Sequence, residues 1–292
     1  MIKMIAADLD GTLLTNSKRL TVNTASAMRR AQEAGICFVP VTGRPMSGVP
    51  EEILNFPGIR YIITSNGAVT TDRQTGERLR SALLDSETAA AIAEIPARLG
   101  LIHSVFINGA GYCEPYFYEK QWAYFRDTPV AAYVRMSRRI TENLKRVILQ
   151  SGNGVENVWM VAGDREERDR LDRMIRETWP VQTVLTAARD IEVGSREADK
   201  GKALMDLAAG LGIRREEILA IGDNENDLGM FRAAGTAAAM GNASDSVKQA
   251  ADLVTDTNER DGAAMVIERA AGQEWGTQPQ NREVIEKNNE IY

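Results

Sequence analysis

Two aspartates stand one residue apart near the start of the chain, directly after an apolar run. Asp8 and Asp10 follow residues 4–7, whose side chains suit a buried strand, and Gly11 comes next. Carboxylates crowded at a strand end repel each other and are costly to desolvate, so the pair favours a bound cation. Mg²⁺ takes hard oxygen ligands and keeps waters that a phosphate can displace, while one aspartate could instead be a nucleophile. The alternative is an ordinary Asp-Gly turn after a strand.

A second acidic cluster follows another apolar run much later in the chain. Residues 218–221 are apolar, and Asp223 and Asp227 come shortly after them through a Gly-Asp step. If both strands belong to one parallel sheet, the two clusters meet at its C-terminal edge. Asp8, Asp10 and Asp223 would then surround one Mg²⁺, with Asp227 supporting them. The alternative is a solvated acidic loop.

Cations and hydrogen-bond donors near such a cluster would allow a phosphate dianion to enter. Thr42, Gly43 and Arg44 end a second apolar strand, which directs a hydroxyl group and backbone N–H groups to the same sheet edge. Lys200 opens a predicted helix, where its ammonium group can act as a point charge on phosphate and on the carboxylates. The alternatives are a strand-ending turn and an exposed lysine at a helix end.

The order of predicted elements determines which strand ends meet. Apolar residues at helical spacing between positions 22 and 34 separate the first strand from the second, at 36–39. A strand, a helix and a second strand form a βαβ unit with parallel strands. A third strand follows at 61–64, and a hairpin at 69–84. Ligands bind at the C-terminal edge of such doubly wound sheets.

The pattern changes in the middle of the chain, where hairpins mix with helices, and parallel α/β order returns afterwards. The predicted fold class is therefore α/β, with a Rossmann-like doubly wound parallel sheet core and an inserted α+β cap domain. We expect the core to comprise residues 1–83 and 190–271, the cap 84–189, and a polar C-terminal tail 272–292.

The composition of the chain limits which binding partners and which cellular compartment we expect. The chain has 292 residues, a formal net charge of −6 and 43% hydrophobic residues, with no basic run that would favour nucleic acid. Cys37 and Cys113 lie far apart and make no metal or redox motif. No apolar run reaches the length of a membrane span. We therefore expect a cytoplasmic protein with no nucleic-acid or membrane partner, whose oligomeric state the sequence leaves open.

The four motifs together resemble those of the haloacid dehalogenase superfamily of phosphohydrolases, in the same order. They are Asp8-Leu9-Asp10-Gly11-Thr12, Thr42-Gly43-Arg44, Lys200-Gly201 and Gly222-Asp223-Asn224-Glu225-Asn226-Asp227. The insertion between the second and third motifs looks like the large cap of the Cof-type subgroup, the IIB branch. Asn66-Gly67-Ala68 and Lys200-Gly201-Lys202-Ala203-Leu204 are also similar to motifs of that subgroup.

The resemblance implies a role for each matching residue. Asp8 would be the nucleophile that forms an aspartyl-phosphate. Asp10 would protonate the leaving oxygen and then activate water, and its backbone carbonyl would ligate Mg²⁺. Lys200 would neutralise charge near Asp8, and Asp223 would complete a metal site formed with Asp8 and Asp10. The residues expected to hold the substrate are Thr42, Gly43, Arg44, Asn66, Lys200 and Asn226.

The implied activity is a Mg²⁺-dependent phosphatase for small phosphorylated metabolites, with sugar phosphates first and phosphorylated cofactors next. Two alternatives stay open, a sugar phosphomutase and a non-catalytic phosphometabolite sensor on the same scaffold. Pro40 lies two residues before Thr42, where it predicts a strand end, a bulge or a sheet edge. The aromatic residues from Phe106 to Phe125 could line a sugar-binding face or form the core of the cap.

Overall fold

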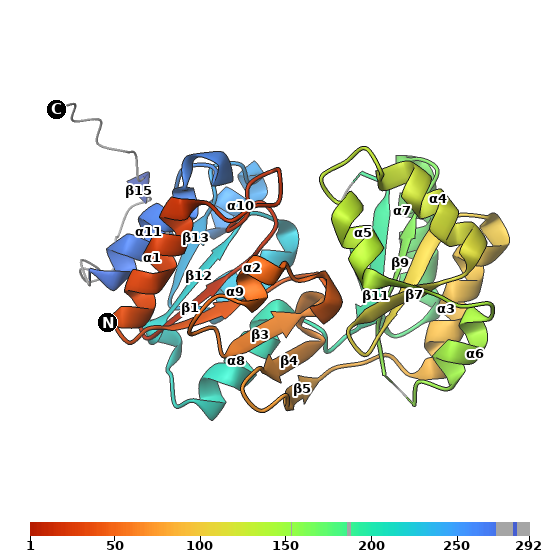
Figure 1. Ribbon diagram of the computed structural model, residues 1–292, viewed down its shortest axis with the longest axis horizontal. Helices are drawn as coiled ribbons and strands as arrows, with labels where there is room; N and C mark the ends of the chain where they lie inside the picture. The colour runs from red at the N-terminus through yellow and green to blue at the C-terminus, as the bar shows by residue number, and fades with distance from the viewer. Residues whose placement is uncertain (153, 186–187, 273–282, 285–292) are drawn as a thin grey trace.

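Two bodies lie side by side in the computed structural model, which describes residues 1–152, 154–185, 188–272 and 283–284 (Figure 1). One body holds the N-terminus and α11, the last described helix, and is built on a parallel sheet. The other is built on a mostly antiparallel sheet and comes from the middle of the chain. We call them the core and the cap. The predicted fold class is confirmed.

The core sheet has six strands in the order β15-β14-β13-β12-β1-β2, and every neighbouring pair is parallel. The strands are β1 (Met4–Ala7), β2 (Cys37–Pro40), β12 (Ile218–Gly222), β13 (Thr236–Ala239), β14 (Leu253–Val254) and β15 (Glu283–Val284). Because β1 and β12 are parallel neighbours inside this sheet, the residues that follow them are brought together at one edge.

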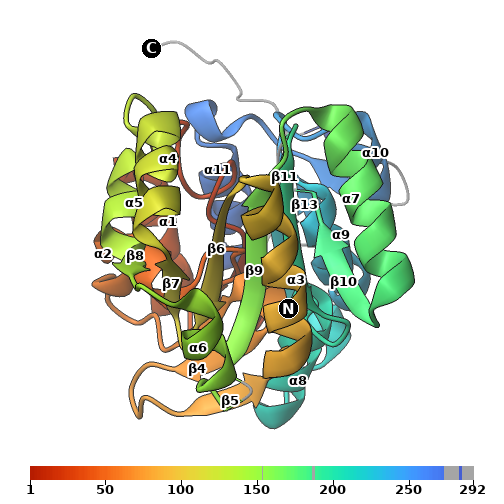
Figure 2. The same cartoon turned by 90° about the vertical axis from the view of Figure 1, so that its right-hand side faces the viewer.

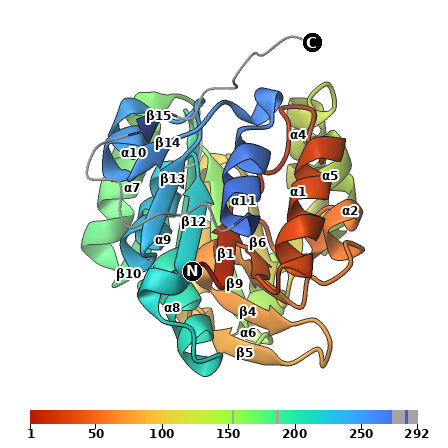
Figure 3. The same ribbon diagram turned by 90° about the vertical axis from the view of Figure 1, so that its left-hand side faces the viewer.

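Helices cover both faces of the core sheet (Figure 3). Residues of α1 (Val22–Glu33), α2 (Glu51–Leu54) and α11 (Gly262–Ala271) pack on one face. Residues of α8 (Lys200–Gly210), α9 (Leu228–Ala233) and α10 (Asp245–Ala250) pack on the other. Strands buried on both faces are expected to be apolar throughout, and all four residues of β1 are buried.

The third predicted strand belongs to a small antiparallel sheet beside the core sheet. This sheet contains β3 (Tyr61–Thr64), β4 (Val69–Asp72) and β5 (Arg78–Ser81), so the predicted hairpin is present. A parallel bridge between Val41 and Ile63 connects it to the end of β2. The short turn η2 (Ser65–Gly67) follows β3 and lies between the core and the cap.

The cap sheet has the order β10-β11-β9-β6-β7-β8, with helices packed against it (Figure 2). Its strands are β6 (Ile102–Ile107), β7 (Ala110–Cys113), β8 (Arg138–Ile140), β9 (Val155–Val161), β10 (Val181–Val184) and β11 (Asp190–Ser195). Its helices are α3 (Ser86–Leu99), α4 (Pro115–Phe125), α5 (Ala131–Ser137), α6 (Leu144–Leu149) and α7 (Arg165–Thr178). One face of the sheet forms an apolar core with α3, α6 and α7. The opposite face carries a smaller apolar cluster that contains Phe106 and Trp159.

The expected cap boundary at residue 190 falls at the first residue of β11, and β11 pairs with β9 and β10 inside the cap sheet. We therefore propose that the core resumes after Ser195, because Ala198 packs with Ala68 and Val69 of the core. The expected tail 272–292 lies outside the described residues, apart from Gly272 and the backbone of β15. Among the described residues, no helix is both long and apolar enough to cross a membrane.

Candidate active site

Three strand ends converge at one edge of the core sheet. Asp8 follows β1, Asp223 follows β12, and Thr42 lies two residues after β2. The last residue of β1 pairs with residues at the ends of both neighbouring strands. Pro40 is the last residue of β2, as its sequence position suggested. The meeting of the motifs at one sheet edge, expected from the βαβ pattern, is therefore present.

Lys200 is the cation at the centre of this edge. It is the first residue of α8, whose N-cap is Asp199, and its side chain is fully buried. Its Nζ lies 2.8 Å from Asp8 Oδ1 and 2.7 Å from Asp227 Oδ1. Burial alone would lower the pKa of Lys200, but the charges of Asp227 and Asp8 outweigh it and raise that pKa. Lys200 therefore stays charged and compensates buried carboxylates.

Backbone and hydroxyl donors hold the second acidic cluster in place. Asp227 Oδ2 accepts hydrogen bonds from the N–H groups of Asp223 and Asn224, at 3.0 and 3.1 Å. The hydroxyl of Thr12 donates to Asp223 Oδ1 at 3.0 Å. Gly11 has φ of +83°, and a Cβ at this position would lie 2.3 Å from Asp223 Oδ2. The glycine of the first motif is therefore required for the carboxylate of the fourth motif to approach.

The carboxylates of Asp8, Asp223 and Asp227 fit a divalent cation. One oxygen from each lies within 4.8 Å of the others. Burial raises the pKa of Asp8 well above its ordinary value, and burial together with the charge of Asp227 raises that of Asp223 to about 6. Three ionised carboxylates beside the single ammonium of Lys200 would leave an excess of two negative charges. All the donors are hard oxygens, which suits Mg²⁺.

The carboxylate of Asp10 points to a different set of partners. Its two oxygens accept from Arg44 Nε at 2.6 Å and Nη2 at 2.7 Å, and Lys18 Nζ lies 2.9 Å away. Burial would raise the pKa of Asp10, but the hydrogen bonds and charge of Arg44 outweigh it and lower the pKa to about 2. Among the described residues, the cluster of three carboxylates therefore comprises Asp8, Asp223 and Asp227, whereas the carboxylate of Asp10 is bound to two cations. The metal-ligand role of Asp10 stays a prediction.

The expected substrate-binding residues are divided between a cavity and a domain contact. Thr42 is buried, and its Oγ1 accepts from the backbone N–H of Arg44 at 3.1 Å. Thr42, Gly43, Arg44 and Asn226 line a cavity of about 380 Å³ together with Asp8 and Asp10. Asn66 does not line this cavity. Its amide accepts from Asn226 Nδ2 at 2.9 Å and donates to a cap glutamate at 2.6 Å.

The cap supplies the opposite wall of the same cavity. That wall is aromatic and polar, and the residues with the largest or most polar side chains are Phe106, Phe125, Tyr133, Arg138, Asn157, Trp159, Asp190 and Glu192. Of the aromatic residues from Phe106 to Phe125, which the sequence suggested as a possible sugar-binding face, the first and the last line this cavity. The aromatic residues between them do not line it. A phosphate held at the core edge would place its organic part against this wall.

Two cap glutamates contact the core turn η2, and sequence reasoning missed both; Glu156 is buried and Glu192 is half-buried. Ser65 Oγ donates to Glu156 Oε2 at 2.5 Å, and Asn66 Nδ2 donates to Glu192 Oε2 at 2.6 Å. Burial raises the pKa of both glutamates, and that of Glu192 reaches about 7. A signal was available, because each glutamate interrupts an apolar strand sequence, where an unpaired carboxylate would be costly.

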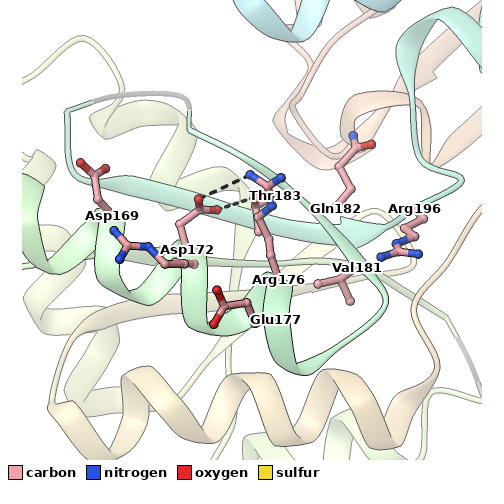
Figure 4. A pocket seen from close by; sticks show the side chains of 9 residues that line it. Asp169, Asp172, Arg176, Glu177, Val181, Gln182, Thr183 and Arg196 are labelled. Atoms are coloured by element: carbon pink, nitrogen blue, oxygen red, sulfur yellow. Dashed lines mark hydrogen bonds and ion pairs between the residues drawn. The ribbon is translucent and has the colours of Figure 1, made fainter.

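A larger hollow of about 980 Å³ lies elsewhere, along α7 and β10 of the cap (Figure 4). Its wall contains both arginines and carboxylates, and Asp172 contacts Thr183 and Arg176 within it. None of the motif residues lines it. The smaller cavity at the core edge is therefore the candidate active site, despite its size.

Comparisons with known proteins agree with this geometry. A family model described as haloacid dehalogenase-like hydrolase matches residues 5–267. The phosphatase YwpJ of Bacillus subtilis is 30% identical over 91% of this chain and 99% of its own. The pyridoxal phosphate phosphatase YbhA of Escherichia coli is 27% identical over 91% of this chain and 97% of its own.

Solved structures are similar over both bodies. A haloacid dehalogenase-like hydrolase from Bacteroides thetaiotaomicron has a TM-score of 0.79 and 28% identity, covering 92% of this chain and 100% of that chain. A structure described as a subclass IIB sugar phosphatase has a TM-score of 0.78 at 23% identity, covering 92% and 98%. The second likeness concerns the fold alone, and that fold includes the cap.

Proposed function

This chain belongs to the haloacid dehalogenase-like hydrolase family as a phosphoric monoester hydrolase of Cof type, and on this premise we propose that it is a Mg²⁺-dependent phosphatase of sugar phosphates. The observation that carries the proposal is the arrangement of Asp8, Lys200, Asp223 and Asp227 at the core edge, where Asp8 lines a cavity whose opposite wall is aromatic and polar. The relatives act on varied phosphorylated metabolites, and the cytoplasmic location stays a prediction.

We propose that Asp8 attacks phosphorus and forms an aspartyl-phosphate, while the bond from phosphorus to the leaving oxygen breaks. Lys200, 2.8 Å from Asp8 Oδ1, compensates charge on the attacking carboxylate. The hydroxyl of Thr42 accepts from the N–H of Arg44, so its own proton is free to donate to a phosphoryl oxygen. Water then attacks the aspartyl-phosphate, releasing inorganic phosphate and restoring Asp8.

Asp10 would transfer protons in both steps. Arg44 and Lys18 hold the pKa of Asp10 at about 2, which keeps the carboxylate ionised, as required to take a proton from the attacking water. The first step requires a proton on Asp10 for the leaving oxygen. Donation to the leaving group therefore needs a looser contact between Asp10 and Arg44 than the one described above.

Asp8, Asp223 and Asp227 would hold Mg²⁺, and the backbone carbonyl of Asp10 would add a ligand, as the family resemblance implies. When bound, the cation supplies charge stabilisation for the transferring phosphoryl group. The donor set supports this assignment, because burial and mutual repulsion raise the pKa of Asp8 and Asp223, and a cation would reverse both effects.

The test is phosphate release from p-nitrophenyl phosphate by the full chain, with Mg²⁺ and with EDTA. We expect release with Mg²⁺, loss of release in EDTA, and recovery when Mg²⁺ is restored in excess. Absence of release under all conditions would overturn the phosphatase proposal, and equal rates in EDTA would overturn the role of the cation. Recovery of an isomerised sugar phosphate, without free phosphate, would favour the mutase alternative.

A further inference from the structure

The cap face that lines the active-site cavity carries polar groups in one row of the sheet. In the strand register, Arg138 on β8 pairs with Gly111 on β7, Gly111 pairs with Phe106 on β6, and Phe106 pairs with Asn157 on β9. Paired residues of adjacent strands point to the same face of a sheet. Arg138, Phe106 and Asn157 all line the cavity, so this row faces the organic part of a bound phosphate ester.

Arg138 is fixed in place by neutral partners. Its Nε donates to Gln121 Oε1 at 3.0 Å, and its Nη1 donates to Ser137 Oγ at 2.7 Å. A Cβ at Gly111 would lie 2.8 Å from Arg138 Cδ, so the side chain crosses β7 only because residue 111 is glycine. The guanidinium carbon lies 4.6 Å from the ring centroid of Phe106. These contacts together hold the guanidinium group of Arg138 in one orientation.

The charge and one donor group of Arg138 are left available. Although its side chain is almost fully buried, no described carboxylate lies within ion-pair distance of it, and its charge acts on Glu192 only from beyond that distance. Its Nη2 donates to no described residue. Buried arginines are usually paired. An oxygen atom of a ligand would complete the set of partners.

The side-chain amide of Asn157 also lacks hydrogen-bond partners among the described residues. Asn157 is 4% exposed, and its Oδ1 is buried without a hydrogen-bond partner. Its amide nitrogen also donates to no residue that the structure describes, and its main chain pairs normally with β6 and β11. Because buried amides nearly always find partners, an unpartnered amide on a cavity wall indicates a group that the ligand satisfies.

We propose that Arg138 and Asn157 determine specificity by binding hydroxyl groups of a polyhydroxylated leaving group, an inference that rests on the phosphatase activity proposed above. A hydroxyl group can both donate to and accept from the amide of Asn157, and a second hydroxyl oxygen can accept from Arg138 Nη2. The C–H face of the same group would lie against Tyr133 and Phe125, which line the cavity beside this row.

The test compares substrates with and without hydroxyl groups, using the full chain with Mg²⁺. The polyol probes are glucose 6-phosphate, mannose 6-phosphate and ribitol 5-phosphate, and the reference is p-nitrophenyl phosphate. For the best polyol probe we expect kcat/KM to fall about 30-fold in Arg138→Met and about 10-fold in Asn157→Leu, mainly through KM, as loss of a charged and a neutral hydrogen bond predicts. The rate with p-nitrophenyl phosphate, which carries no hydroxyl group, should fall less than the rate with the polyol probe, so the ratio between the two substrates should change.

The matched control is Arg139→Met, which changes the next residue of the same strand. Arg139 is exposed, contacts Tyr112 and does not line the cavity, so this variant should leave every probe unchanged. Equal losses for polyol and reference substrates, or equal effects of Arg138→Met and Arg139→Met, would overturn the inference. The inference would also be overturned if Arg138→Met and Asn157→Leu both hydrolyse the polyol probes as fast as the wild-type enzyme does.

The outcomes also separate this inference from the proposed function. If the wild-type chain releases no phosphate from p-nitrophenyl phosphate, the phosphatase proposal fails. If it does, and the two variants alter no ratio between substrates, only the present inference fails. Should Arg138→Met lower the melting temperature too far for kinetics, Asn157→Leu decides the question, because that change removes no side-chain hydrogen bond among the described residues.

Discussion

The core and the cap both hold carboxylates near the contact between the two bodies, but they stabilise them differently. At the core edge, Asp8 and Asp227 lie within 2.8 Å of the ammonium of Lys200, and Asp10 is bound by Arg44 and Lys18. In the cap, Glu156 and Glu192 accept hydrogen bonds from neutral groups, the hydroxyl of Ser65 and the amide of Asn66.

The contrast separates two tasks. Paired cations hold negative charge in place, which a site must do if it attacks phosphorus and binds a divalent ion. Burial raises the pKa values of the cap carboxylates, and the hydrogen bonds from their neutral partners offset this only in part. We therefore expect the contact between cap and core to depend on pH. The core is therefore built for chemistry, and the cap for contact with the core and with the leaving group.

Asp8→Asn tests the core side with the largest expected effect. The variant keeps the size of the side chain but loses the nucleophilic oxygen, so phosphate release should fall at least about 10⁴-fold, or more than about 5 kcal/mol in activation free energy. The measurement is release from p-nitrophenyl phosphate with Mg²⁺. A variant that keeps a tenth of the activity would contradict the role of Asp8, provided that its circular dichroism matches the wild type.

Lys200→Met tests whether the core carboxylates depend on their cation. It would leave Asp8 and Asp227 buried without compensation, which should destabilise the protein by about 3–5 kcal/mol. The free energy of unfolding in urea measures this. Lys202→Met is the matched control, because Lys202 lies on the same helix with an exposed ion pair and should change stability by less than about 1 kcal/mol. Similar losses for both variants would argue against a special role of Lys200.

The same contrast explains what the sequence could predict. Asp8, Thr42, Lys200 and Asp223 each stand next to an apolar run or at a helix start, so local pattern and parallel order suffice to bring them together. The direction of the Asp10 carboxylate was not predictable, because it depends on where the side chain of Arg44, which follows β2, is placed relative to Asp10.

The cap wall could not be predicted in the same way. Arg138, Phe106 and Asn157 come from three strands and meet only through the register of a mixed sheet. A shift of one residue in any of those strands would turn its side chain to the opposite face, and no local motif specifies that register. The glutamates inside apolar strands were the one sequence signal for the domain contact.

Glu192→Gln tests the cap side through pH. Burial raises the pKa of Glu192 to about 7 in the folded protein, from an ordinary value of 4.5. The folded state therefore holds its proton more tightly than the unfolded state, and stability is lost as the pH rises from about 4.5 through 7, by up to about 3 kcal/mol. The variant lacks this loss, so it should match the wild type at pH 5 and exceed it at pH 8.5.

Unfolding in urea at both pH values measures this difference. Glu142→Gln is the control, because Glu142 is an exposed residue of the cap, and that change should leave the pH dependence of the wild type intact. If Glu192→Gln is equally destabilising at both pH values, the carboxylate is ionised throughout, and the contrast between core and cap loses its electrostatic basis.

Ser65→Ala tests the same contact with the smallest expected effect. The change removes the hydroxyl donor 2.5 Å from Glu156, while the backbone N–H of Gly109 still donates to the other carboxylate oxygen at 2.7 Å. Loss of one of two donors to a buried group should cost about 1–2 kcal/mol in free energy of unfolding. Because this hydrogen bond lowers the pKa of Glu156, the cost should be larger at pH 8.5 than at pH 5.

Ser47→Ala provides the matched control for that measurement. The hydroxyl of Ser47 is buried near the cap but has no hydrogen-bond partner among the described residues, and the backbone N–H of Ser47 donates to Gly109 O in either variant. Removing an unsatisfied buried hydroxyl should be neutral or slightly stabilising at both pH values. A loss in Ser47→Ala as large as that in Ser65→Ala would mean that both changes report packing, whereas a loss confined to Ser65→Ala and growing with pH identifies the Glu156 hydrogen bond as its source.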